Sequence, residues 1–357
     1  MGKNIVVCND GTGNKYGKNN TNVVKAFERI RRDTPGEPTR EAGRQYRQQI
    51  AFYDPGIGTF SILGNTPGPI RQRLGRLIGQ AFGYGLRQNL SDALRFLIRY
   101  YEPGDCLYFI GFSRGAFTVR VLADLVAMFG VLRPGCENLI PYVLEMYFKR
   151  KNYPETILTG FTESFCNLAD IKCVAVFDTV ASLGWALGKT IRPRRLDGGI
   201  NPSIKSALHA MAIDEKRKKF PVARWDVDND ETGESDQVVK QVWFAGVHSD
   251  VGGWYEERGL SDIALKWLLA EAQVRGLVLE RGWDMDLSDD PLGKMHNSRT
   301  GFWRLWPPAP RQIKAGDWVH GSVYIRKEHD DLNYYPSLKD SIKIETPGQS
   351  TATKPDS

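Results

Sequence analysis

The chain has 357 residues, a length that suits one large α/β domain with insertions or about two domains of roughly 150 residues each. Apolar residues make up 41% and charged residues 25%, values that exclude a mostly disordered, collagen-like or coiled-coil protein. The net charge is +6, from 48 Lys and Arg against 42 Asp and Glu, so the location of this surplus matters more than its size.

The cysteines and the N-terminus indicate where the chain is made. None of the five cysteines belongs to a CxxC or Cys/His metal-binding pattern, so we expect reduced thiols, no metal and no cofactor. The N-terminus enters an apolar run at once and has no signal-peptide pattern. No apolar run approaches the ~18 residues of a membrane-spanning helix. These features predict a soluble protein that is made in the cytoplasm.

Short apolar runs that are rich in β-branched and aromatic residues alternate with helical patterns along the chain. The predicted strands are Asn4–Cys8, Gln49–Tyr53, Cys106–Phe112, Lys172–Phe177 and Val239–Val247. Helices are predicted over Leu86–Tyr100, Ala116–Phe129, Ser203–Asp214 and Ser261–Gln273, the last of them with a Ser261-Asp262 cap. Continuous apolar runs are typical of strands covered on both faces, so the pattern predicts an α/β fold with a mostly parallel central sheet between two helical layers.

Two stretches interrupt this alternation. Residues 184–236 are rich in Pro, Gly and charge, which predicts a lid or cap insertion over the sheet. Residues 282–339 contain many Trp, Pro and Asp with little periodicity, which predicts a loop-rich C-terminal cover. The polar segment 341–357 is predicted to be a disordered tail. We therefore expect a single domain over residues 1–340.

The most informative motif is Gly111-Phe-Ser-Arg-Gly115, which follows the predicted strand Cys106–Phe112 and precedes a predicted helix. A Gly-x-Ser-x-Gly pentapeptide between a strand and a helix is typical of a nucleophile elbow, because the glycines permit a tight turn that exposes the serine hydroxyl above the sheet. Ser113 is therefore the predicted nucleophile. The alternative is an ordinary turn serine.

A serine hydroxyl needs a base that removes its proton and an acid that orients this base. Asp178 and His248 each follow a predicted strand, and they give the chain order Ser, Asp, His that is found in α/β-hydrolases. Each residue also has a structural alternative, Asp178 as a turn cap and His248 as a support of the glycine-rich loop. His320 competes for the role of base. Asp250 competes for the role of acid, or fixes the loop.

An oxyanion hole requires backbone N–H donors near the nucleophile. One donor should be the N–H of Arg114, the residue after the nucleophile. The second is expected from Gly11 or Thr12, in the glycine-containing loop that follows the first predicted strand. A phosphate-binding loop is the competing interpretation, but the Walker lysine and the full dinucleotide glycine pattern are both lacking.

The positive charge is concentrated between Trp185 and Trp225, a segment that contains ten basic and three acidic residues. The rest of the chain is therefore close to neutral. The candidate substrate-binding residues in this patch are Arg194, Arg195, Lys216 and Arg217. Such a cationic patch suits an anionic lipid headgroup or membrane surface, and its alternative is a solvated helix face with a flexible charge run. A nucleic-acid partner is not expected, because no aromatic stacking platform accompanies the charges.

Several motifs together resemble a known family over about residues 3–330. They are Asn9-Asp-Gly-Thr-Gly-Asn14, Tyr53-Asp-Pro-Gly-Ile-Gly58, Gly111-Phe-Ser-Arg-Gly-Ala116, Phe177-Asp-Thr-Val180, His209-Ala-Met-Ala-Ile-Asp-Glu215 and His248-Ser-Asp-Val-Gly-Gly253. The chain resembles the α/β-hydrolase domain that forms the catalytic part of type VI secretion phospholipase effectors. The resemblance implies a serine hydrolase of lipid or other ester bonds, with Ser113, Asp178 and His248 on the triad motifs.

The resemblance also bears on partners and on alternatives. For an effector it implies a secretion or immunity partner and export by a signal-independent secretion system. The sequence thus predicts ester hydrolysis through an acyl-enzyme, with a phospholipid as the expected substrate. A catalytically silent hydrolase-fold module that binds a partner or an anionic ligand, and a carboxylesterase of non-lipid substrates, remain the alternatives.

Overall fold

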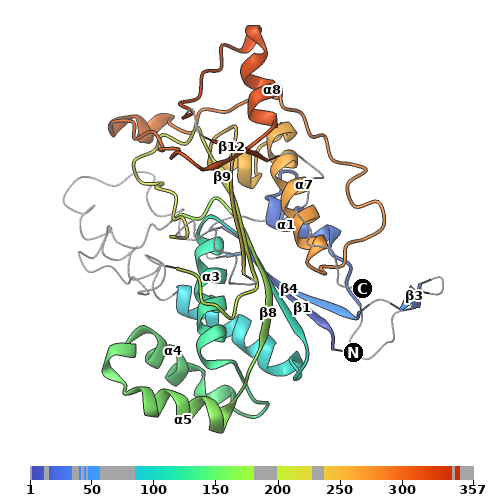
Figure 1. The fold of residues 1–357 in the computed structure, drawn as a ribbon, viewed down its shortest axis with the longest axis vertical. Coiled ribbons are helices and arrows are strands. Elements are labelled where there is room, and N and C mark those ends of the chain that lie inside the picture. Colours follow the sequence, from blue (N-terminus) through green and yellow to red (C-terminus); the bar gives the residue numbers. More distant parts are fainter. Residues whose placement is uncertain are drawn as a thin grey trace.

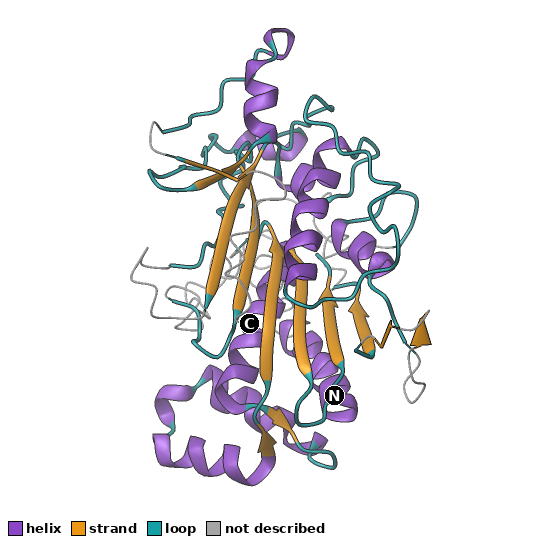
Figure 2. Cartoon of the chain, turned by 45° about the vertical axis from the view of Figure 1, so that its right-hand side comes forward, coloured by secondary structure: helices purple, strands orange, loops and turns teal. Residues whose placement is uncertain are grey.

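The computed structural model describes residues 2–11, 16–33, 40–41, 44–45, 47–56, 85–180, 199–226, 237–339 and 342–345. In this part of the chain, eight strands form one sheet in the order β12-β11-β10-β9-β8-β5-β1-β4 (Figures 1 and 2). All the neighbouring pairs within this sheet are parallel. The predicted α/β fold with a mostly parallel central sheet is therefore confirmed.

The strands of the sheet are short and mostly buried. Their bounds are Asn4–Asn9 (β1), Gln49–Asp54 (β4), Cys106–Phe112 (β5), Asp170–Phe177 (β8), Ser206–Ala212 (β9), Val238–Phe244 (β10), Trp318–His320 (β11) and Lys343–Glu345 (β12). Two further pairs, β2 (Arg40–Glu41) with β3 (Arg44–Gln45) and β6 (Val131–Leu132) with β7 (Cys166–Asn167), are antiparallel.

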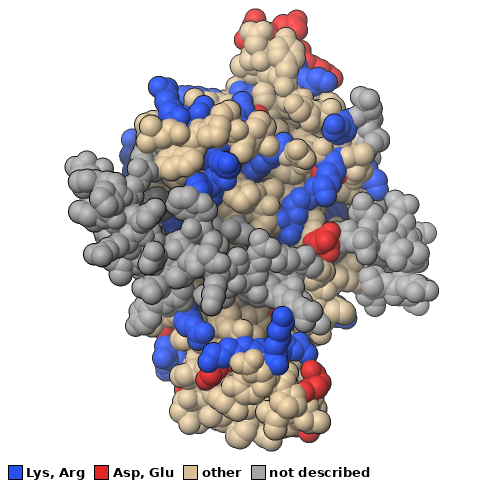
Figure 3. Space-filling model, turned by 90° about the vertical axis from the view of Figure 1, so that its left-hand side faces the viewer, with Lys and Arg blue, Asp and Glu red and all other residues tan. Residues whose placement is uncertain are grey.

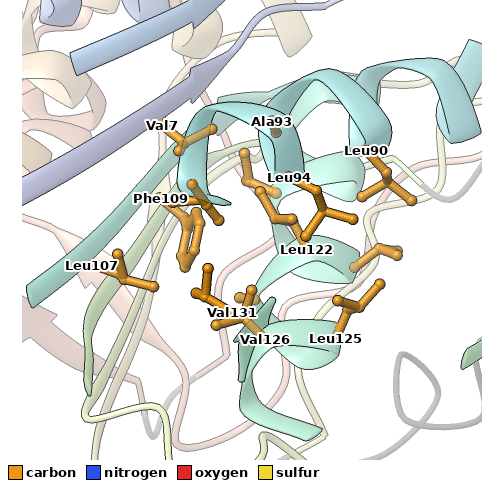
Figure 4. Close-up of a cluster of buried hydrophobic side chains, with 14 of the residues drawn as sticks. Val7, Leu90, Ala93, Leu94, Leu107, Phe109, Leu122, Leu125, Val126 and Val131 are labelled. Atoms are coloured by element: carbon orange, nitrogen blue, oxygen red, sulfur yellow. The ribbon is translucent and has the colours of Figure 1, made fainter. Parts of the chain in front are cut away.

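Helices cover both faces of the sheet. The helical segments are Asn22–Arg29 (α1), residues 85–100, Ser113–Phe129 (α3), Ile140–Phe148 (α4), Glu155–Phe165 (α5), His248–Gly252 (α6), Gly259–Val274 (α7) and Ser322–Glu328 (α8). Alternate residues of β1 point to opposite faces, so Val7 packs against the segment 85–100 and α3, whereas Val6 packs against α1 and α7. Figure 4 shows the first of these clusters, in which Val7 and Phe109 lie beside Leu94 and Leu122.

The sheet register brings several strand ends to one edge. Phe112 of β5 pairs with Phe177 of β8, and Phe177 pairs with Ala210 of β9. Because all these strands are parallel, the residues that follow them leave the sheet on the same side. In an open α/β sheet, this carboxyl edge is where ligands and catalytic groups are held.

Several predicted elements are wrong. Ser203–Asp214 is not a helix, because Ser206–Ala212 forms β9, in which all residues are buried between β8 and β10. This part of residues 184–236 therefore belongs to the sheet rather than to an insertion over it, and residues 184–198 and 227–236 lie outside the described residues. The helix α7 begins at Gly259, so Ser261 is not its cap, and the Ser261 hydroxyl donates to the Arg258 carbonyl instead.

The C-terminal region also contributes more to the sheet than its sequence suggests. Residues 282–339 consist largely of loops and short 3-10 turns, but they also contain β11 and α8. The strand β12 lies within the predicted disordered tail and pairs with β11, so the prediction of disorder is wrong for Lys343–Glu345. No helix in the described ranges is long and apolar enough to cross a bilayer.

Candidate active site

Ser113 occupies a strained turn between β5 and α3. Its φ of 57° lies in the left-handed region, which is costly for a residue with a side chain and typical of functional sites. The turn is possible because of two glycines. A Cβ atom on Gly111 would lie 2.7 Å from the Ala116 Cα, and one on Gly115 would lie 2.2 Å from the Asn9 carbonyl oxygen. The sequence motif therefore folds as a tight strand-to-helix turn, the geometry expected of a nucleophile elbow.

The structure brings Ser113, His248 and Asp178 into one hydrogen-bonded line. The His248 Nε2 atom lies 2.9 Å from the Ser113 Oγ, and its Nδ1 atom lies 2.5 Å from the Asp178 Oδ2. These residues are separated by up to 135 positions in the sequence. Ser113 and Asp178 directly follow β5 and β8, and His248 begins α6 after β10. All three are buried, with Ser113 exposed by 8%.

Hydrogen bonds hold both carboxylate oxygens of Asp178. The Arg311 guanidinium donates from Nη1 to Oδ1 and from Nη2 to Oδ2, at 2.5 and 2.9 Å, and the Ala212 N–H donates to Oδ1 at 3.0 Å. Burial by itself would raise the pKa of this carboxyl, but the charge of Arg311 and the hydrogen bond to His248 hold the pKa well below its ordinary value. Asp178 is therefore ionised and fixed in orientation at neutral pH.

Arg311 was not predicted from the sequence. It comes from the C-terminal cover, 133 residues after Asp178, and it also donates to the carbonyls of Ala212 and Phe220. Its side chain is almost completely buried. No local pattern around Pro310-Arg311 marks this role, since the pairing depends on how the cover folds back over the sheet.

Two aromatic rings pack against His248, and its burial favours the neutral imidazole. The Phe112 and Phe220 rings pack against its imidazole, with centroids 4.6 and 5.2 Å away. Burial lowers the pKa of His248 below its ordinary value, and the nearby carboxylate of Asp178 only partly offsets this effect. A neutral imidazole with its Nδ1–H on Asp178 leaves Nε2 ready to accept the Ser113 proton.

Glu215 supports the backbone of His248. Its Oε2 accepts the His248 N–H at 3.3 Å, and its carboxylate is bound by the backbone and guanidinium of Arg217. Burial opposes the charge of Glu215, but Arg217 outweighs it, so the pKa of Glu215 is lowered. The Arg217 guanidinium also lies 3.6 Å from the centroid of the Phe220 ring. Arg217 is thus engaged within the site, rather than directed at solvent.

The other candidate acid and base have different surroundings. At the end of β11, the His320 Nδ1 pairs with the Ser322 hydroxyl at 2.9 Å, its ring stacks on Phe244, and burial lowers its pKa to about 4. Asp250 accepts the Val247 N–H and both the N–H and the Nδ1 of His296. Neither residue has a hydrogen bond to Ser113, Asp178 or His248 within the described chain. Asp250 instead ties the loop before His248 to the C-terminal cover.

His209, in β9, supports the backbone next to Asp178. Its Nε2 accepts the Thr179 N–H at 3.0 Å, and burial lowers its pKa to about 3, so the ring is neutral. This hydrogen bond fixes the residue next to Asp178, whose own φ of 38° also lies in the left-handed region. The role is structural, as a buried acceptor behind a strained turn.

The structure supports the predicted oxyanion donors Arg114, Gly11 and Thr12 to different degrees. The N–H of Arg114 lies in the first turn of α3, whose N-terminus favours negative charge. The Gly11 N–H donates to the Asp10 Oδ1 at 2.6 Å, so an oxyanion would have to replace this bond. Thr12 lies outside the described residues, as do Arg194 and Arg195. Lys216 is exposed and lines a cleft beside the site.

Comparison with known proteins gives the family. Residues 3–271 match the family described as "T6SS, Phospholipase effector Tle1-like, catalytic domain", in which T6SS is the type VI secretion system. The chain belongs to this family. By its description, this family takes in catalytic domains like that of the phospholipase effector Tle1.

The individual relatives and solved structures share 30% sequence identity or less with this chain. An uncharacterized protein of Saccharomyces cerevisiae is 30% identical over 235 residues, which are 61% of this chain and 32% of the relative, so the chain spans about a third of that protein. Among solved structures, an uncharacterized protein from Pseudomonas aeruginosa has 19% identity and a TM-score of 0.42, over 79% of this chain and 47% of the other. A Tle1 effector bound to the VgrG spike of the type VI secretion system has 17% identity and a TM-score of 0.38, over 72% and 52%.

Proposed function

We propose that this chain is a serine hydrolase that cleaves carboxylic esters of phospholipids through an acyl-enzyme. The observation that carries the proposal is the hydrogen-bonded line from the strained Ser113 through His248 to Asp178. A serine at an elbow, a neutral buried imidazole and an ionised buried carboxylate are the groups that nucleophilic acyl transfer requires. Membership of the Tle1-like family supports a phospholipid as the source of the ester.

In this proposal, each group has its own step. The Ser113 Oγ attacks the acyl carbonyl carbon while the His248 Nε2 takes its proton, and Asp178 stabilises the imidazolium that forms. The Arg114 N–H and the N-terminus of α3 stabilise the negative carbonyl oxygen of the tetrahedral intermediate. The imidazolium then returns the proton to the departing lysolipid oxygen. Water, activated by the same imidazole, releases the fatty acid from Ser113.

Family membership also suggests how such a protein reaches its substrate. We propose delivery by a type VI secretion system, with a partner on the secretion apparatus and an immunity partner in the producing cell. Catalysis does not require this route, since Ser113, His248 and Asp178 all belong to this one chain. The catalytic proposal can therefore be tested on the purified protein alone.

A fluorophosphonate probe followed by lipid product analysis tests the catalytic proposal. The purified chain should form a covalent adduct on Ser113 and release a fatty acid and a lysolipid from phospholipid vesicles. The variant Ser113→Ala should do neither. A folded wild-type chain that neither reacts with the probe nor cleaves any ester would instead indicate a silent hydrolase-fold module. Wild-type cleavage of short soluble esters without cleavage of any phospholipid would indicate a non-lipid carboxylesterase.

A further inference from the structure

A cleft of about 910 Å³ opens beside the loop that carries His248. Its wall includes Val247, the residue before His248, and Ser298 from the C-terminal cover. The Ser298 hydroxyl donates to the Glu215 Oε1 at 2.9 Å, and the Glu215 Oε2 accepts the His248 N–H. The cleft and the proposed catalytic base therefore share structural supports, and the two sites are adjacent.

The cleft has an unbalanced positive charge. Three cations line it, namely Lys216, Arg299 and Arg304. Among the described residues, the Arg299 guanidinium donates only to the carbonyls of Arg304 and Trp306, and the exposed Lys216 and Arg304 have no ion pair. Figure 3 shows one face of the molecule, with patches of Lys and Arg in its upper part and in its lower part.

The carboxylate in the cleft wall is that of Asp214, which interacts electrostatically with Lys216 but is outnumbered by the three cations. Asp214 accepts the Gly246 N–H at 2.7 Å and the Tyr334 hydroxyl at 3.0 Å, so its oxygens are held against the protein. Burial also raises the pKa of Asp214, which disfavours its charge. An anion that enters the cleft would therefore meet three cationic side chains and one carboxylate that is already hydrogen-bonded to the protein.

We propose that this cleft binds the phosphate of the phospholipid substrate, with Lys216 and Arg304 as its main contacts and Arg299 as support. The proposal rests on the proposed ester hydrolysis at Ser113 and adds a specificity site to it. In a glycerophospholipid, the phosphate and the scissile acyl ester are only a few bonds apart, which suits two adjacent sites. Arginine and lysine are the side chains that bind phosphate oxygens best, by charge-assisted hydrogen bonds. A neutral ester would gain nothing from these contacts.

The test compares two soluble substrates with the same acyl chain. They are dihexanoylphosphatidylglycerol, kept monomeric below its critical micelle concentration, and p-nitrophenyl hexanoate, which has no phosphate. In the double variant Lys216→Ala/Arg304→Ala, we expect kcat/KM for the phospholipid, relative to kcat/KM for the neutral ester, to fall at least tenfold through a higher KM. The matched control Lys218→Ala/Lys327→Ala removes two exposed positive charges that do not line the cleft, and should change this ratio less than twofold.

The outcomes separate the competing explanations. An unchanged ratio in the cleft variant overturns the proposal, as does an equal fall in the control, which would reveal a general charge effect. A loss seen with phosphatidylglycerol vesicles but not with the monomeric lipid also overturns it, since it indicates membrane adsorption. Inorganic phosphate should compete with the phospholipid in the wild type. If it does so while the cleft variant keeps the wild-type ratio of the two kcat/KM values, the cleft takes free phosphate only, and the proposal is overturned. Failure of the proposed function looks different, because the wild type then cleaves neither ester or cleaves only the neutral one.

Discussion

Replacing Arg311 by glutamine should both destabilise the protein and slow the reaction. Arg311 and Asp178 form a buried, bidentate pair, with side chains exposed by 4% and 0%. Removing one partner of such a pair leaves an uncompensated buried charge, which costs about 3–5 kcal/mol of folding free energy. The Asp178 carboxylate would also lose the group that fixes its orientation, and a misplacement of about 1 Å in a catalytic group can lower the rate about 100-fold. We therefore expect kcat to fall by about this factor, with little change in KM.

The pH dependence of the free energy of unfolding shows whether the loss of stability in Arg311→Gln comes from its charged pair with Asp178. The pKa of Asp178 is held below its ordinary value of 3.8, so the ionised pair stabilises the wild type above this pH, and the contribution is lost as the pH falls further. The stability gap between the wild type and Arg311→Gln, measured by urea unfolding, should thus be full at pH 7 and shrink below about pH 4. A gap that does not change over this range would contradict the assignment.

The pair between Arg224 and Asp317 supplies a matched control for Arg311. It is also bidentate, with distances of 2.5 and 2.9 Å, but neither residue has a hydrogen bond to the triad. Arg224→Gln should lower the free energy of unfolding and leave kcat of the folded protein within about twofold. Because the charge of Arg311 also lowers the pKa of His248, Arg311→Gln should move the acid limb of kcat/KM to higher pH, whereas Arg224→Gln should not. Wild-type kcat and stability in Arg311→Gln would refute the reasoning.

Three further predictions concern the site itself. His248→Ala should abolish probe labelling of Ser113 and ester hydrolysis, whereas His320→Ala, which alters a stacked ring on Phe244, should retain labelling; the reverse pattern would make His320 the base. The acid limb of kcat/KM should be centred below the ordinary histidine value of 6.5, because burial lowers the pKa of His248, and a midpoint above it would contradict this environment. Gly115→Ala should cost about 1–3 kcal/mol and most of the activity, since its Cβ would lie 2.2 Å from the Asn9 carbonyl oxygen. The control Gly160→Ala, in α5 with no atom within 4 Å of its added Cβ, should be neutral or stabilising by about 0.5–1 kcal/mol, and equal effects of the two alanines would show that close packing is not the cause.

The parts of the site that follow directly from strand ends were predictable. The strained turn at Ser113 is encoded within a few residues, because a strand, two glycines and a helix follow each other without interruption. Asp178 and His248 were found because parallel strands release their last residues at one edge of the sheet. For the same reason, the order of these residues in the chain was informative before their contacts were known.

Other parts depend on tertiary contacts that no local pattern reveals. Arg311 and Glu215 reach the triad from loops, and their partners lie 133 and 33 positions away in the sequence. The segment Ser206–Ala212 is rich in Ala, Leu and Met, which favour helices, but its position between two strands makes it a buried strand. The strands β11 and β12 have only three residues each, too few for a periodic pattern, and they form by pairing with the sheet edge.

The most direct test of the central claim is to locate the fluorophosphonate adduct by mass spectrometry of the intact, folded chain. A single adduct on the peptide that contains Ser113, lost in His248→Ala and retained in His320→Ala, is the result expected from the hydrogen-bonded triad. An unlabelled Ser113 in the folded wild type, or ester hydrolysis that persists in Ser113→Ala, would contradict it.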